Sequence, residues 1–157
     1  MFNQLKRDEF LTLAAVHPRI IVHKEILGDC ITPIHVYQAL KAYMAGASLL
    51  ESSPKEKNLG RYSFLGFNVL AQFCVKNNQI TVNTAQGSDK MTASDPLAAL
   101  RQFHHDRKAY TDPVLSGFVG GIVGYFSYES ACLFESTLPT FSDHEFPEIL
   151  FKCYRDH

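Results

Sequence analysis

The sequence predicts an α+β fold in which helices flank a mainly antiparallel sheet. Helix-like and strand-like segments are mixed along the 157 residues, and they lack the regular strand–helix alternation of a parallel sheet. Asn77 and Asn78 separate two segments of alternating hydrophobicity, which indicates a β-hairpin because asparagine tolerates positive φ. The length and the 46% of hydrophobic residues are sufficient for one domain with its own core.

Helices are expected in three places. The first spans roughly residues 4–15 and ends before a proline. The second begins at Thr32 and Pro33, because the threonine hydroxyl can cap a helix and proline suits its first position. The third begins at Asp95 and Pro96. The apolar face of the second contains Pro33, Val36, Tyr37, Leu40 and Met44, and that of the third contains Leu97, Leu100 and Phe103.

Strands are expected where apolar and polar residues alternate or where β-branched residues gather. They span residues 18–26, 47–52, 60–66, 69–75, 80–82, 117–125 and 149–154. The segment 117–125 is either a strand alone or a strand that runs into a helix over residues 127–134. Residues 53–59 are expected to form a charged surface loop, and residues 85–93 a further loop.

The charge and the distribution of apolar residues exclude several functional classes. Fifteen lysines and arginines face 16 acidic residues, so the net charge is −1 and nothing attracts nucleic acid or an anionic membrane. No apolar run approaches the ~20 residues that span a bilayer. Acidic residues precede any apolar stretch at the N-terminus, which argues against a secretory signal. The four cysteines form no CxxC pair, so we expect reduced, mostly packed thiols and a cytoplasmic location.

The histidine and glycine motifs give no catalytic or metal-binding signature. His104 and His105 are adjacent, and adjacent helical residues point about 100° apart, so they cannot share one metal ion. HExxH, zinc-binding Cys/His and GxSxG patterns are absent from the sequence. The GxxGGxxG segment at residues 117–124 matches neither the dinucleotide fingerprint nor the P-loop. It favours close approach of two backbones in a sheet over a phosphate site.

The segments Leu49–Ser52 and Gly60–Gly66 are the most informative part of the chain. The first ends an apolar strand with Glu51 and Ser52, and the second brings Arg61 and two aromatic rings. If the two strands pair, they line a small cavity with apolar walls and polar ends, which suits a zwitterionic amino acid. The alternative is an internal ion pair between Glu51 and Arg61 that only ties the sheet together, and the residues alone favour this alternative.

Four motifs occur in order along the chain: residues 29–37 (DCITPIHVY), 49–52 (LLES), 60–66 (GRYSFLG) and 120–125 (GGIVGY). Together they resemble the N-terminal region of anthranilate synthase component I, a chorismate-utilising enzyme of tryptophan biosynthesis. The resemblance covers nearly the whole chain. It implies that residues 1–157 form a single N-terminal regulatory and scaffold domain of that family.

The resemblance also implies what this chain lacks. The family's chorismate-binding and magnesium-binding residues lie in a large C-terminal catalytic part, which is absent here. We therefore expect no catalytic residue, no metal ligand and no cofactor in these 157 residues, and no activity of the chain alone. For the longer enzyme, the resemblance implies a lyase that uses Mg²⁺.

The family's feedback site for L-tryptophan includes the LLES segment. The resemblance therefore assigns Leu50, Glu51 and Ser52 to an effector site, with Arg61, Tyr62 and Ser63 as further lining candidates, and so favours the amino-acid pocket over the ion pair. The implied partners are the C-terminal catalytic part and a glutamine amidotransferase subunit, component II, which supplies ammonia. Two alternatives remain open. One is the same domain of aminodeoxychorismate synthase component I, the folate-pathway relative, and the other is a self-standing small-ligand binding module.

Overall fold

A six-stranded sheet forms the centre of the computed structural model, which describes residues 5–52, 62–92, 95–115, 117–135, 137–139 and 145–157. The strand order is β4-β3-β2-β6-β5, and β1 pairs with β2 outside this path. The strands are β1 (Ser48–Glu51), β2 (Ser63–Lys76), β3 (Gln79–Thr84), β4 (Gly87–Thr92), β5 (Ile122–Phe126) and β6 (Ile149–Asp156). The helices are α1 (Arg7–Ala14), α2 (Pro33–Lys41), α3 (Pro96–His105) and the 3₁₀ helix η1 (Tyr128–Leu133). These strands all pair antiparallel, so the predicted fold class is confirmed.

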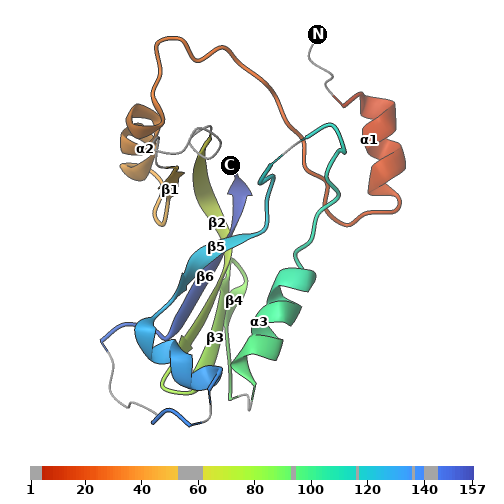
Figure 1. Cartoon of the computed structure of the whole chain (residues 1–157). Helices are drawn as coiled ribbons and strands as arrows, with labels where there is room; N and C mark the ends of the chain where they lie inside the picture. The colour runs from red at the N-terminus through yellow and green to blue at the C-terminus, as the bar shows by residue number, and fades with distance from the viewer. Residues whose placement is uncertain (1–4, 53–61, 93–94, 116, 136, 140–144) are drawn as a thin grey trace.

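The core lies between the sheet and α3, which runs along one face of the sheet (Figure 1). The rings of Phe73 on β2 and Phe103 on α3 pack with their centroids 5.4 Å apart. Phe73, Val75, Ile80 and Ile149 are the largest fully buried side chains, and they come from β2, β3 and β6. Strands far apart in sequence therefore share one apolar layer, and burying each such side chain stabilises the fold by roughly 1.5–3 kcal/mol.

β2 is a single 14-residue strand, whereas the sequence predicts two strands over 60–66 and 69–75. Gly66 does not end the strand, because it leaves room for the ring of Tyr154 on β6. A Cβ at Gly66 would lie only 2.7 Å from that ring. Asn68 has a positive φ of 55°, and the β2–β6 register shifts between Val69 and Ala71. The irregularity that looks like a strand break is thus a bulge inside one continuous strand.

The hairpin prediction is confirmed. Asn77 and Asn78 have φ values of 50° and 61°, and Lys76 pairs with Gln79 across the turn. The loop predicted over residues 85–93 is wrong, because Gly87–Thr92 forms the edge strand β4. All six residues of β4 are exposed, so the strand is held by backbone pairing and shows no apolar alternation in its sequence.

The strand predicted over residues 18–26 is also wrong. Only Ile20 makes a bridge, a parallel one to Tyr110, and the rest of the segment is extended without a partner strand. Val22 is 63% exposed and Ile26 is 74% exposed. A run of β-branched residues predicts a strand only where a neighbouring strand can cover it.

Both predicted proline-initiated helices are confirmed. The Thr32 hydroxyl accepts a hydrogen bond from the backbone N–H of His35 at 3.3 Å, and Asp95 caps α3 by accepting two backbone N–H groups. The predicted apolar stripe of α3 faces the core, where Leu100 and Phe103 are buried. By contrast, α1 buries no residue and lies apart from the sheet (Figure 1). Within the described part of the chain, no helix is both long and apolar enough to cross a membrane.

Candidate functional site

Pairing between β1 and β2 brings the two informative segments together. Leu50 lies opposite Phe64, and Glu51 lies opposite Ser63. The Ser52 hydroxyl donates a hydrogen bond to the Tyr62 carbonyl oxygen at 3.2 Å. The predicted side-by-side arrangement is therefore confirmed for residues 48–52 and 62–66. Arg61 lies outside the described residues.

The alternation of a strand places Glu51 and Ser52 on different faces of this two-stranded ribbon. Residues directly opposite each other in an antiparallel pair share a face, so Leu50 and Phe64 lie on one face and Glu51 and Ser63 on the other. Ser52 follows the last residue of β1. If the alternation continues to it, Ser52 lies on the same face as Leu50. By this alternation the carboxylate and the hydroxyl approach a ligand from different faces of the ribbon, and their assignment to one ligand site stays a prediction.

Leu50, Tyr62, Phe64 and Phe118 form an aromatic face on one side of this ribbon. The ring of Phe64 lies 6.2 Å from the ring of Tyr62 and 5.4 Å, edge to face, from that of Phe118. Leu50 is 46% exposed and Tyr62 is 53% exposed, so half of this surface is open to solvent. An open apolar surface of this kind suits the flat side chain of an aromatic ligand.

Sequence reasoning missed Phe118. It follows Gly117 in a segment expected to be a strand, but Gly117, Gly120 and Gly121 have φ values of +89°, +143° and +120°. The segment is therefore an irregular loop, and β5 begins only at Ile122. The predicted close backbone approach is confirmed at Gly124 alone, where a Cβ would lie 1.9 Å from the Leu150 carbonyl oxygen.

β1 pairs with β2 only, so in the described part of the chain its other edge is free. A free edge presents backbone N–H and C=O groups that are already aligned. These groups can bind the carboxylate and the ammonium of an amino acid, while its side chain packs on the adjacent aromatic face. The arrangement is thus chemically suited to recognition of a zwitterion and has no nucleophile–base pair for catalysis among Leu50, Glu51, Ser52, Tyr62 and Ser63.

The adjacent residues His104 and His105 lie in the last turn of α3. His105 Nδ1 is 3.8 Å from a carboxylate oxygen of its neighbour Asp106, and both side chains are largely exposed at the end of α3. Across the described ranges, no group of three or more His, Cys, Asp or Glu side chains is arranged to hold a metal ion.

No family model matches the sequence, but individual curated proteins do. Anthranilate synthase component 1 of Pseudomonas aeruginosa is 34% identical over 138 residues, which cover 87% of this chain and 28% of that protein. The protein of the same name from Mycobacterium tuberculosis is 32% identical over 126 residues, 78% of this chain and 24% of that protein. The chain is related to anthranilate synthase component 1.

A more distant relative of the same name, from Methanothermobacter marburgensis, is 28% identical over 124 residues, 79% of this chain and 25% of its own length. The chain therefore spans about a quarter of the curated anthranilate synthase component 1 proteins that it matches. The resemblance that the four motifs indicate is confirmed.

Proposed function

We propose that this chain is a non-catalytic N-terminal part of an anthranilate synthase component 1 and carries part of an L-tryptophan feedback site. The observation that carries the proposal is the pairing of Ser48–Glu51 with Ser63–Gly66, which places the LLES segment at a free sheet edge beside exposed aromatic rings. The names of the relatives support the tryptophan branch over the folate branch. They also argue against a self-standing binding module, because the chain corresponds to only a quarter of each.

In this proposal the whole enzyme converts chorismate and ammonia to anthranilate and pyruvate, and the chemistry belongs to the other three quarters of the protein. Component II, a glutamine amidotransferase, supplies the ammonia. Mg²⁺ is proposed to bind in the catalytic part as well, as the resemblance to the family implies. The chain alone is expected to form no anthranilate.

The ligand is proposed to lie along the free edge of β1. Its indole ring packs on Leu50 and Tyr62, and its carboxylate accepts backbone N–H groups near Ser52. Its ammonium lies next to the outer edge of β1. There the exposed Glu51 carboxylate, which belongs to the face of the ribbon opposite Leu50, can pair with it. Arg61 and Ser63 remain candidates for further contacts, and the catalytic part is proposed to close the other side of the pocket.

Feedback then acts as a shift between two conformations. Tryptophan wedged between this domain and the catalytic part favours the arrangement of the two that binds chorismate poorly. Because a ligand shifts an equilibrium only through its different affinities for the two states, the effect is expected to be a coupling of about 1–3 kcal/mol.

The Ser52→Phe variant tests the site in the full-length protein. Anthranilate formation from chorismate, followed by fluorescence, is expected to fall with added tryptophan in the wild type. In Ser52→Phe the concentration of tryptophan that halves the activity should rise at least about tenfold, because the ring occupies the space of the indole. Activity without tryptophan should be unchanged, since the reacting groups lie elsewhere.

Ser88→Phe is the matched control, because Ser88 is also exposed on an edge strand, β4. It should leave tryptophan inhibition as in the wild type. Full tryptophan sensitivity of Ser52→Phe would contradict the site. A full-length protein that makes no anthranilate with either ammonia or component II would contradict the enzyme assignment.

A further inference from the structure

A cavity that is open to solvent lies beside the middle of β2. Its volume is about 640 Å³, and it is lined by the residues after α2, the middle of β2, the β3–β4 turn and the start of the connector after α3. No residue of β1 and none of the aromatic face contributes to it. Three arginines line it, Arg19, Arg107 and Arg155, and none of its described lining residues is acidic.

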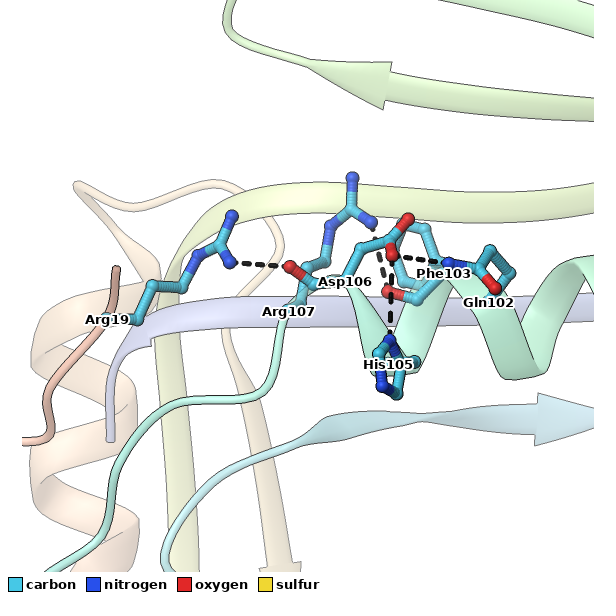
Figure 2. Close-up of polar contacts among 6 residues, drawn as sticks. All are labelled: Arg19, Gln102, Phe103, His105, Asp106 and Arg107. Atoms are coloured by element: carbon cyan, nitrogen blue, oxygen red, sulfur yellow. Dashed lines mark hydrogen bonds and ion pairs between the residues drawn. The ribbon is translucent and has the colours of Figure 1, made fainter. Parts of the chain in front are cut away.

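Two of these arginines are held at the C-terminal end of α3 (Figure 2). Arg19 Nη1 donates to the Asp106 carbonyl oxygen, and Arg107 Nη1 donates to the Phe103 carbonyl oxygen at 3.0 Å. The Arg107 guanidinium also stacks on the Phe103 ring, 3.9 Å from its centroid. Figure 2 shows both guanidinium groups pointing to the same side of the helix end. These contacts hold both guanidinium groups near the helix end without a ligand.

The positive charge of this pair is not neutralised within the described residues. Neither Arg19 nor Arg107 forms an ion pair with a carboxylate there, whereas Arg155 Nε lies 3.2 Å from Asp156 Oδ2. Each guanidinium has five N–H donors, and the backbone carbonyls occupy only part of them. The charge and the remaining donors are available to an anion in the cavity.

The buried Cys153 also lines the cavity. Burial raises the pKa of the Cys153 thiol, and the charges of Arg107 and then Arg19 oppose that rise. Two arginines that are far apart in the sequence therefore both act electrostatically on this thiol in the cavity wall.

The rest of the lining is mixed. Met44, Val69 and Ala71 supply an apolar wall, and Thr84 and Gln86 supply polar groups at the turn. The volume falls within the roughly 300–1,000 Å³ of small-molecule sites and is far larger than one inorganic ion needs. A ligand that joins an anionic group to an apolar group fits this lining better than a small inorganic oxyanion does.

We propose that this cavity binds a small organic anion with one or two carboxylates on an apolar body. Arg19 and Arg107 bind the carboxylate, because their planar N–H groups match its two oxygens. Val69 and Met44 cover the body of the ligand. This site is separate from the proposed tryptophan site and does not depend on it.

The test is an NMR titration of the purified ¹⁵N-labelled chain with phthalate, an aromatic dicarboxylate. Saturable shifts are expected at the backbone amides that line the cavity, including Ala71, Ala85 and Cys153. Phthalamide, the neutral analogue of the same shape, should bind at least about tenfold more weakly, because a charged hydrogen bond is lost. Inorganic phosphate should also bind more weakly than phthalate, since it lacks the apolar body.

Arg19→Gln is expected to weaken phthalate binding about tenfold. Arg101→Gln is the matched control, because it removes an exposed arginine from α3 outside this cavity, and it should change the affinity less than twofold. Ala85→Phe, a substitution at the exposed turn, should block the cavity without any change in charge. Circular dichroism checks that each variant is folded.

Three results would overturn the proposal. One is the absence of saturable shifts with phthalate at the cavity amides, and another is equal loss of affinity in Arg19→Gln and Arg101→Gln. The third is tighter binding of phosphate or phthalamide than of phthalate, because the site would then not select an organic carboxylate.

Discussion

At the scale of single residues, Cys74 and Cys153 show how burial in the sheet changes the pKa of a thiol. Burial raises the pKa of both thiols, and the Glu148 carboxylate adds to the rise at Cys74. All four cysteines are free thiols, as predicted, and three of them are at least partly buried. Cys30 departs from the prediction of packed thiols because it is exposed in the connector before α2.

The thiols are expected to react with Ellman's reagent at rates that follow their burial. Cys30 should react first, and Cys74 and Cys153 at least about tenfold more slowly, because only an accessible thiolate attacks and burial disfavours it. Stopped-flow absorbance near pH 8 measures the rate and amplitude of each phase. Cys30→Ser should remove the fastest phase, whereas a single fast phase of four thiols would refute the burial argument.

At the scale of elements, short-range signals were the most dependable. The capping residues Thr32 and Asp95 begin helices as predicted, and Asn77–Asn78 turns the chain between β2 and β3. The predictions for residues 85–93 and 18–26 were wrong in opposite ways. β4 has no strand pattern but finds a partner in β3, while residues 18–26 have the pattern and find only the single bridge at Ile20. Pairing depends on what lies beside a segment, which its own residues do not encode.

Asp95→Ala is expected to destabilise the protein by about 1 kcal/mol. The Asp95 carboxylate accepts the N–H groups of Leu97 and Ala98 at 3.0 and 2.9 Å, and these donors would lose their partner at the start of α3. Urea unfolding followed by circular dichroism measures the change.

Asp95→Asn should retain most of the stability, because asparagine also caps helices well. Asp89→Ala serves as the charge-matched control, since Asp89 is exposed on β4. An equal loss in Asp89→Ala and Asp95→Ala would show that charge, and not capping, is responsible.

At the scale of the whole molecule, apolar surface gathers where β1 meets β2. Leu50, Tyr62 and Phe118 are each 42% exposed or more. Phe64 contacts the rings of Tyr62 and Phe118 and lies opposite Leu50 in the strand pair. Connected apolar patches of this kind usually mark a surface that another protein part covers. In the proposed function, that part is the remainder of anthranilate synthase component 1.

The isolated chain is therefore expected to self-associate as its concentration rises. Multi-angle light scattering should show a mass above that of the 17.7 kDa monomer at high concentration. Tyr62→Lys should shift the equilibrium toward monomer, because a charge on the aromatic face opposes its burial. Val114→Lys, at a 69% exposed position outside that face, is the control. A strict monomer at all concentrations would contradict the role of this patch.

The sequence by itself determined the fold class, the start of α2 and α3, and the hairpin. These features follow from caps, turns and periodicity, which act over a few residues. The tertiary structure alone decided that β1 pairs with the start of β2 and that Phe118 joins the aromatic face. It also decided that Arg19 and Arg107 both donate hydrogen bonds to backbone carbonyl oxygens at the end of α3. Such contacts join residues that are distant along the chain, and they depend on how whole elements pack, which no local pattern specifies.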